Sequence, residues 1–372
     1  MIFLRYWEHV KSKYLFENIS LKGFQDLPVL SVTQDKGVVY RDNLDIDIKY
    51  DLLTLKNYKL VQPGDFIISL RSFQGGFETS YLTGITSPAY TIFNFIDNQD
   101  KDHAFWQYLF KRIDFINSLK RVTFGIRDGK AISFSQFGDV KVEYPSFDEQ
   151  KHIATVLTKL DNTLQLHERK CEELTLIKKS LLQKLFPKED KIKPEIRYKN
   201  FSDAWEQRKL GEVAEIKTGS RNHQDSVDNG KYPFFVRSEK VERLNEYDFD
   251  TKAILVPGDG RIGEIFHYYD GKFALHQRVY KVDNFKEVNP LYLLNLFKYK
   301  FKKHALRLNA QGTVPSLRLP MFTNWNILIP NLNEQQKIGL FFQQLDSLIA
   351  LHQRKLEKLK QLKKFLLQNM FI

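Results

Sequence analysis

Cysteine is almost absent from this chain, which has 1 in 372 residues. A disulfide scaffold needs pairs of cysteines, and a thiolate-based zinc or iron–sulfur site needs several, so both are excluded within one chain. No apolar run approaches the roughly 18 residues of a membrane span. The first residues also lack the basic start and apolar stretch of a signal peptide. We therefore expect a soluble, cytoplasmic protein.

Catalytic signatures are missing as well. The segment Gly258–Gly263 has the glycine spacing of a dinucleotide loop, but a strand-like run follows it where that loop requires a helix N-terminus. The segment Asn289–Tyr292 lacks the second proline of an amino-group methyltransferase loop, and a proline in the first turn of a helix accounts for it. No Walker loop, zincin helix or nucleophile elbow occurs. We expect no catalytic residue, no metal ligand and no cofactor bound by this chain.

Apolar and basic residues are plentiful. The apolar fraction of 42% and the 30 phenylalanines are enough for real cores, and the length suggests two or three domains. The net charge of +12 favours nucleic acid or another polyanion as partner. Nearly all of this surplus lies in residues 191–372, which carry 31 basic and 20 acidic residues.

The chain repeats itself once, at an offset of 185 residues. The motif Pro145-x-x-x-Glu-Gln150 returns as Pro330-x-x-x-Glu-Gln335, and the same offset continues without a gap to the pair Phe186 and Phe371. Of the 42 positions compared, 18 are identical. Chance does not produce this agreement, so the chain contains a duplication.

Both copies have apolar residues in alternating steps of four and three, which is the signature of a coiled coil. A proline precedes each predicted helix, and Pro187 ends the first. These apolar positions form the seam along which the two helices would pack. The seam is interrupted at the same two places in both copies, by His167 and Lys178 and by their equivalents His352 and Lys363. Such polar residues either fix the register of the helices, or lie at the edge of the seam, where the histidine is hydrogen-bonded and the lysine extends its charged end into water. The seam residues predicted in the two helices are Ile153, Leu157, Leu160, Leu164, His167, Leu174 and Leu181, and Ile338, Phe342, Leu345, Ile349, His352, Leu356, Leu359 and Leu366.

The two remaining regions are rich in short aromatic and β-branched runs broken by glycine and proline, which predicts strands with a few short helices. The sequence thus predicts an α+β protein with a pseudo-twofold internal repeat. Two mixed α/β domains are separated by two long helices, which pair as an antiparallel coiled coil. The predicted boundaries are 1–144 and 191–329 for the domains, and 145–190 and 330–372 for the helices with their linker.

These motifs resemble those of type I restriction–modification specificity subunits. The duplicated Pro…Glu-Gln helix ending in Lys-Lys-x-Leu-Leu-Gln-x-x-Phe is similar to the conserved regions of that family. Four further segments resemble sequence blocks of the family's target recognition domains: Trp205–Gly211, Leu30–Gly37, Ile68–Gly75 and Gln311–Leu317. In the first domain, the segment Gly125–Ile132 differs from the sequence pattern of the family.

The resemblance implies a DNA-binding subunit of a host-defence system that reads two half-sites split by a nonspecific spacer. Two modification subunits would dock on it and methylate adenine with S-adenosylmethionine. Restriction subunits would add cleavage that depends on ATP and Mg. A single-chain methyltransferase or endonuclease, and a coiled-coil adaptor that binds only proteins, remain the alternatives.

Arg and Lys bind phosphates and read guanine, and Asn and Gln read adenine, so polar loop residues are candidate DNA contacts. In the first domain the candidates are Gln34, Lys36, Arg71, Ser72, Gln74, Arg121, Arg127 and Lys130. In the second they are Lys217, Ser220, Arg221, Asn222, Arg237, Ser238, Lys240, Arg261, Gln277, Arg278, Gln311, Thr313 and Arg318.

Overall fold

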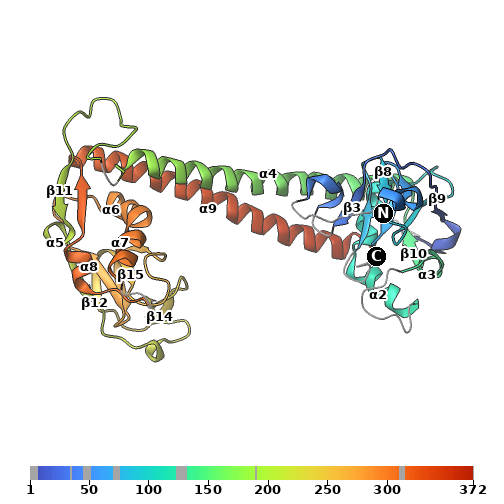
Figure 1. The fold of residues 1–372 in the computed structure, drawn as a ribbon. Helices are drawn as coiled ribbons and strands as arrows, with labels where there is room; N and C mark the ends of the chain where they lie inside the picture. The colour runs from blue at the N-terminus through green and yellow to red at the C-terminus, as the bar shows by residue number, and fades with distance from the viewer. Residues whose placement is uncertain are drawn as a thin grey trace. The chain divides into compact units, whose positions relative to one another are not determined.

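The computed structural model describes residues 7–33, 36–44, 52–69, 76–122, 132–188, 191–309 and 315–371. The chain divides into two compact units. Unit 1 consists of residues 1–166 and 356–372, and unit 2 of residues 167–355. Each unit therefore combines one globular region with parts of both long helices (Figure 1).

Unit 1 contains short antiparallel strands in small sheets, with order β2-β9-β6-β7 in the largest and the pairs β1-β10, β3-β4 and β5-β8. The strands are β1 (Glu8–Lys11), β2 (Phe16–Ile19), β3 (Leu30–Thr33), β4 (Gly37–Tyr40), β5 (Lys59–Val61), β6 (Phe66–Ile68), β7 (Phe77–Thr79), β8 (Gly84–Thr86), β9 (Thr91–Phe95) and β10 (Lys141–Tyr144). The short helices are α1 (His103–Phe110), α2 (Ile113–Val122) and α3 (Phe134–Gly138).

Phenylalanine fills the core of unit 1. The rings of Phe16, Phe93 and Phe137 are at most 1% exposed, and their centroids lie 4.6–5.6 Å apart. Close aromatic pairs of this kind contribute about 0.5–1.5 kcal/mol each beyond the area that they bury. Phe371, near the end of the chain, stacks on Phe105 of α1 at 5.3 Å, so the last helix completes the core of this unit.

Unit 2 is built on a larger sheet, with strand order β12-β17-β15-β16-β13-β14, and the separate pair β11-β18. The strands are β11 (Glu206–Lys209), β12 (Glu215–Thr218), β13 (Tyr232–Phe235), β14 (Glu242–Leu244), β15 (Phe249–Pro257), β16 (His267–Leu275), β17 (Val279–Asp283) and β18 (Asn326–Ile329). The helices are α5 (Leu210–Val213), α6 (Pro290–Leu296), the π-helical turn η6 (Phe297–Phe301), α7 (Lys302–Leu308) and α8 (Leu319–Thr323).

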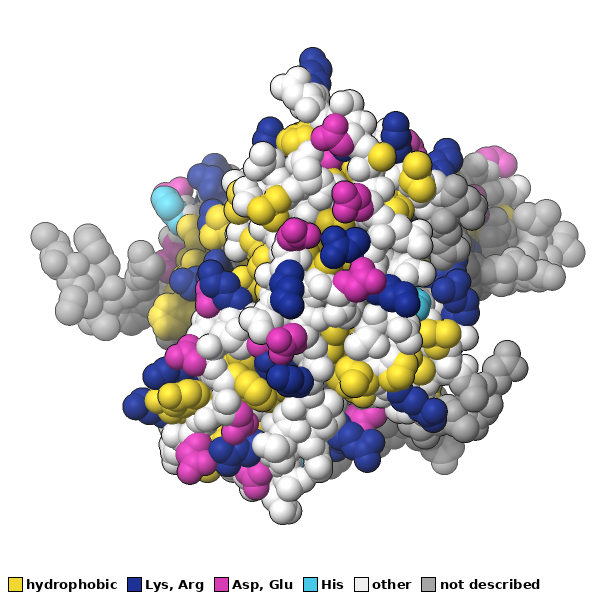
Figure 2. All heavy atoms as spheres, turned by 90° about the vertical axis from the view of Figure 1, so that its left-hand side faces the viewer, with side chains coloured by type: hydrophobic (Ala, Val, Ile, Leu, Met, Phe, Trp, Pro, Cys, Tyr) yellow, Lys and Arg dark blue, Asp and Glu magenta, His cyan; other side chains and the backbone are white. Residues whose placement is uncertain are grey.

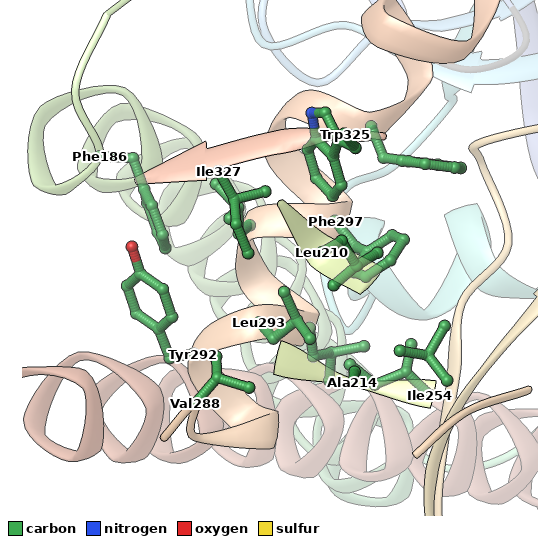
Figure 3. Packing of buried hydrophobic residues seen from close by; sticks show 14 of the residues in the cluster. Phe186, Leu210, Ala214, Ile254, Val288, Tyr292, Leu293, Phe297, Trp325 and Ile327 are labelled. Atoms are coloured by element: carbon green, nitrogen blue, oxygen red, sulfur yellow. The ribbon is translucent and has the colours of Figure 1, made fainter. Parts of the chain in front are cut away.

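The core of unit 2 joins this sheet to helices from both ends of its sequence. Figure 3 shows Phe186 facing Tyr292 of α6, and their ring centroids lie 5.2 Å apart. Ile254 of the central strand β15 and Trp325 belong to the same buried cluster. Phe186 thus has the role in unit 2 that Phe371 has in unit 1, as the offset of 185 residues requires.

The two long helices are α4 (Phe147–Leu185) and α9 (Leu332–Asn369). The beginning of each is held by the glutamine of the duplicated motif. Gln150 Oε1 accepts from the backbone N–H of Asp102 at 3.1 Å, and Gln335 Oε1 accepts from that of Asn289 at 2.7 Å. Asp102 and Asn289 are the N-cap residues of α1 and α6, so each glutamine joins a long helix to the start of a short helix in its globule.

The seam of α4 and α9 is antiparallel. In unit 1, Leu157 near the start of α4 shares a core with Leu366 near the end of α9. In unit 2, Leu174 near the end of α4 shares a core with Phe342 near the start of α9. The predicted antiparallel coiled coil and the mixed α and β fold class are therefore confirmed.

Polar seam residues pair reciprocally, as the duplication implies. In unit 2, Lys178 forms an ion pair with Asp346. In unit 1, the equivalent Lys363 lies 2.5 Å from Asp161, which is the equivalent of Asp346. His167 and His352 meet each other, with 2.8 Å between their Nδ1 atoms. These contacts favour the register role that the sequence left open for the polar seam positions.

Two kinds of feature are absent from the residues that the structure describes. None of the helices is both long and apolar enough to cross a membrane. No group of three or more His, Cys, Asp or Glu side chains in the same part of the chain is placed to hold a metal ion.

Candidate nucleic-acid interface

Several loops of unit 2 meet beside its six-stranded sheet, and we call residues 219–223, 236–240, 258–263, 275–278 and 315–318 the loop cluster. Backbone hydrogen bonds tie them together. Gln277 N–H donates to Arg221 O at 2.9 Å, and Gly258 N–H donates to Arg278 O at 2.8 Å. Leu317 N–H in turn donates to Gly258 O at 2.6 Å. The cluster is therefore one connected surface made from distant parts of the sequence.

Glycine allows two of these loops to approach each other. A Cβ atom on Gly219 would lie 2.0 Å from Leu275 O, closer than any side chain tolerates. The clash would be with a backbone atom, which cannot rotate out of the way as a side chain can. Only glycine therefore fits at this position. This contact places Ser220, Arg221 and Asn222 directly beside residues 275–278.

Arg221 fastens the same contact with its side chain. Its guanidinium donates to Asp248 at 2.9 Å and to Glu246 at 2.9 Å. The other oxygen of Asp248 accepts from the backbone N–H of Leu275 at 3.1 Å. The hydrogen bonds to Asp248, and then those to Glu246, raise the pKa of Arg221. The arginine is therefore a permanent cation that joins three segments.

Two other candidate arginines are also paired with acids. Arg237 lies 3.2 Å from Asp259, and Arg261 contacts Glu264 at 2.8 Å and Glu239 at 3.1 Å. Arg237, Asp259 and their neighbours line a groove of about 470 Å³. The face drawn in Figure 2 likewise has basic and acidic side chains interspersed, with no continuous basic area. The charges of these arginines are thus balanced locally.

His276 lies under the cluster and is 4% exposed. Its Nδ1 accepts from the backbone N–H of Arg278 at 2.9 Å, which fixes the turn at residues 276–278. Burial, and then the charge of Arg237, lower the pKa of His276. The imidazole is consequently held neutral, as an acceptor of that N–H requires.

The remaining candidates of the second domain are more scattered. Lys217 lies on β12, 3.2 Å from Glu215. Ser220, Lys240 and Arg318 are exposed in or next to the loop cluster, and Ser238 Oγ donates to Lys240 O at 2.9 Å. Gln311 and Thr313 lie outside the described residues.

Two candidates of the first domain lie among the described residues. Lys36 and Arg121 are exposed side chains of unit 1. The candidates that lie outside the described residues are Gln34, Arg71, Ser72, Gln74, Arg127 and Lys130.

Sequence reasoning missed the acids that hold the arginines. Asp248 is 27 residues from Arg221, and Asp259 is 22 residues from Arg237. No spacing rule connects such pairs, because the strands of the sheet bring them together. The buried His276 was missed for the same reason.

The long helices carry a second surface, which is also duplicated. In unit 1, Leu166 is 61% and Leu362 is 45% exposed. In unit 2, their repeat equivalents Leu351 and Ile177 are 41% and 45% exposed. Exposed apolar side chains mark a docking site where they gather into a patch, so these repeated positions are candidates for such a site in each unit.

Comparison with known proteins accounts for the duplication. The family model described as "Type I restriction modification DNA specificity domain" matches residues 10–176 and again residues 202–361. The chain belongs to the type I restriction–modification specificity family. The predicted resemblance is therefore confirmed, and it extends over most of the chain.

Individual relatives agree with this family. The chain is 31% identical to the Type I restriction enzyme EcoDI specificity subunit of Escherichia coli over 147 residues, which is 39% of this chain and 31% of that protein. It is 26% identical to the MjaVIII specificity subunit of Methanocaldococcus jannaschii over 264 residues, which is 61% of this chain and 60% of the relative. The chain thus spans less than two thirds of the length of either relative.

Solved structures share the fold. The type I restriction–modification S subunit of M. genitalium superposes with a TM-score of 0.70, at 15% identity, over 100% of this chain and 98% of that one. A chain from a study of complex assembly and conformational transition of the type I R-M system superposes with a TM-score of 0.51, at 14% identity, over 98% of this chain and 97% of that one.

Proposed function

We propose that this chain is the DNA-recognition subunit of a type I restriction–modification complex and reads a bipartite target. The observation that carries the proposal is that the DNA specificity domain occurs twice, at residues 10–176 and 202–361. Each copy would read one half-site, and the helices α4 and α9 would set the length of the nonspecific spacer. The proposal places the chain in the cytoplasm, where it meets DNA.

The chemistry of the loop cluster supports DNA as the ligand of unit 2. The cluster offers exposed amides at Asn222 and Gln277 and an exposed guanidinium at Arg278. Such groups read base edges in the major groove or bind phosphates. The paired arginines hold the loops in place, so the surface can meet a duplex without first being ordered.

The duplicated apolar positions support two protein partners of one kind. Leu166 and Leu362 would contribute to one docking face, and Leu351 and Ile177 to the other. We assign these faces to two modification subunits, which would bind S-adenosylmethionine and methylate adenine. Restriction subunits would supply ATP- and Mg-dependent cleavage. In this proposal the specificity chain contributes no catalytic residue.

A mobility-shift titration of the chain with its modification subunits tests DNA binding. We expect the affinity for duplex DNA to fall steeply as salt rises, because phosphate contacts release counterions. Affinity that is absent or insensitive to salt would favour the adaptor that binds only proteins.

A second measurement addresses catalysis. The pure chain, incubated with labelled S-adenosylmethionine and target DNA, should incorporate no label, and addition of the modification subunit should restore incorporation. Incorporation by the chain alone would instead support a single-chain methyltransferase.

A further inference from the structure

Two exposed amide side chains of the loop cluster are hydrogen-bonded to each other. Gln277 Nε2 donates to Asn222 Oδ1 at 2.6 Å, although the two residues are 55 positions apart. Both side chains are exposed. An exposed amide normally bonds to water, so a direct pair that remains open to solvent has hydrogen-bonding groups to offer to a ligand.

This hydrogen bond leaves a donor group on one residue and an acceptor on the other for a ligand. Asn222 retains its NH₂, and Gln277 retains its carbonyl oxygen. If the amides exchanged roles, Gln277 would retain an NH₂ and Asn222 a carbonyl, so the pattern does not depend on which of them donates. The two side chains together therefore offer a donor and an acceptor, the same combination of groups that a single amide uses to bond an adenine.

This pattern distinguishes the four bases in the major groove. Adenine offers N7 as acceptor and N6–H₂ as donor, which complements one donor and one acceptor. Guanine offers two acceptors there, so the free carbonyl of the pair would meet an oxygen or nitrogen lone pair. Thymine offers no donor and cytosine no acceptor at its groove edge, so each satisfies only half of the pair.

The backbone under the pair is held from both sides. Gln277 N–H donates to Arg221 O at 2.9 Å, and Asn222 N–H donates to the carboxylate of Asp225 at 2.7 Å. The side chain of Arg221 locks the loop beneath through Asp248. A contact that is ordered before binding loses less conformational entropy when the ligand arrives.

The nearby arginines are less suited to reading a base. Arg221, Arg237 and Arg261 all donate to carboxylates, so a base would have to displace an ion pair. Arg278, adjacent to Gln277, has no ion-pair partner among the described residues. It can therefore bind the backbone or a neighbouring base while the amides read theirs.

We propose that Asn222 and Gln277 act as one unit that reads a single adenine in the half-site recognised by unit 2. This assignment rests on the proposed function in DNA recognition, and it names two specificity-determining residues and the base that they select.

The test starts from the full chain in complex with its modification subunits. Methylome sequencing of cells that express the wild-type complex gives the target, and competition binding then uses duplexes with each base pair of the half-site replaced in turn. Asn222→Ala and Gln277→Ala should each reduce discrimination roughly 5- to 150-fold at one A·T position and leave the other half-site unchanged. The double variant should lose no more than either single variant, because the two amides act together.

A charge variant separates reading from a structural role. Asn222→Asp keeps the bond from Gln277 but replaces the free NH₂ of residue 222 with an acceptor oxygen, so preference at that position should move from adenine toward cytosine, whose N4–H₂ is a donor. Gln224→Ala, which removes another exposed amide of the same loop, serves as the matched control and should change nothing.

The outcomes separate the inference from the function on which it rests. If the wild type shows no sequence-dependent binding or methylation, the proposed function itself is wrong. If the wild type is specific and the alanine variants lose affinity uniformly over all duplexes, or lose none, the assignment of the amide pair is overturned.

Discussion

Gln335 is a single buried side chain that satisfies three backbone groups on two segments of unit 2. It accepts from Asn289 N–H at 2.7 Å and donates to Pro330 O at 2.8 Å and to Glu287 O at 3.2 Å. Only 1% of the residue is exposed, so water cannot replace these bonds if the amide is removed. This arrangement explains why the motif needs glutamine at this position in both copies.

Gln335→Ala should lower the free energy of unfolding by about 2–3 kcal/mol, because it leaves buried backbone groups without partners. Gln344→Ala, at an exposed position of the same helix, should change it by less than about 0.5 kcal/mol. Denaturant titration followed by tryptophan fluorescence measures both. Equal, small effects would mean that the glutamine bonds do not stabilise the helix start.

The pair of His167 and His352 makes the seam sensitive to pH. With 2.8 Å between the Nδ1 atoms, one ring donates and the other accepts, so both cannot be protonated in this geometry. Burial in the seam, followed by the charges of His167, Lys355 and Lys170, lowers the pKa of His352. The folded state therefore binds fewer protons at this position than the unfolded chain does.

A lowered histidine pKa stabilises the fold above the unfolded value near 6.5, and that stabilisation is lost as the pH falls through the folded value. We expect the wild type to lose more stability between pH 7.5 and pH 5.5 than His352→Leu loses. Other buried histidines act in both proteins and cancel in this difference. His152→Gln on the exposed side of α4 is the control, and a parallel loss in the wild type and His352→Leu would argue against the pair.

At the scale of elements, the long helices were the most predictable part. The sequence predicts both helices from apolar residues spaced alternately four and three positions apart. It also predicts that they begin after Pro145 and Pro330 and that α4 ends before Pro187. The structure confirms these predictions. The strand β18 (Asn326–Ile329) is one of the short β-branched runs from which the sequence predicts strands, and it leads directly into the second helix motif.

The sequence did not reveal which parts of the two helices face each other. The repeat offset of 185 residues makes the heptad 171–177 equivalent to 356–362, and the heptad 164–170 equivalent to 349–355. It does not say which of these equivalent heptads lie opposite each other in the antiparallel pair. The contact between His167 and His352 shows that only the second pair of heptads lies at one level of the seam. The loop cluster was equally hidden, because its partners come from separate strands of the sheet.

Deleting 164–170 together with 349–355 should therefore shorten the helix pair by about 10 Å and leave the core contacts of both units in register. If α4 and α9 set the spacing of the half-sites, the half-sites stay the same and the spacer becomes shorter, by up to roughly 3 base pairs. Methylation mapping reads both quantities at once. An unchanged spacer would show that the helices do not set its length.

At the scale of the whole molecule, each repeat supplies the end of its long helix to the globule of the other repeat. The globular part of unit 1 is completed by the end of α9, through Phe371, and that of unit 2 by the end of α4, through Phe186. Lys363 meets Asp161 in the first unit, and Lys178 meets Asp346 in the second. Residues 167–186 therefore carry the same contacts as residues 352–371, and one could replace the other.

The fragment 1–190 should consequently fold as an antiparallel homodimer. Phe186 of one copy would occupy the place of Phe371 in the other, and Lys178 would meet Asp161 of the partner copy, so the lysine on the seam has an acid to pair with. Two identical globules related by a twofold axis should read inverted repeats of one half-site, which gives a palindromic target with the modification subunits.

Sedimentation of the fragment decides the first step of this prediction, and a folded monomer at micromolar concentration would contradict it. Lys178→Asp should weaken the dimer, because it places two acids together, and adding Asp161→Lys should restore it by reversing the pair. Methylation mapping decides the second step: a palindromic site supports equivalent docking of both copies. A nonpalindromic site would mean that the two units do not engage DNA through the same surface, even though they share one helix motif.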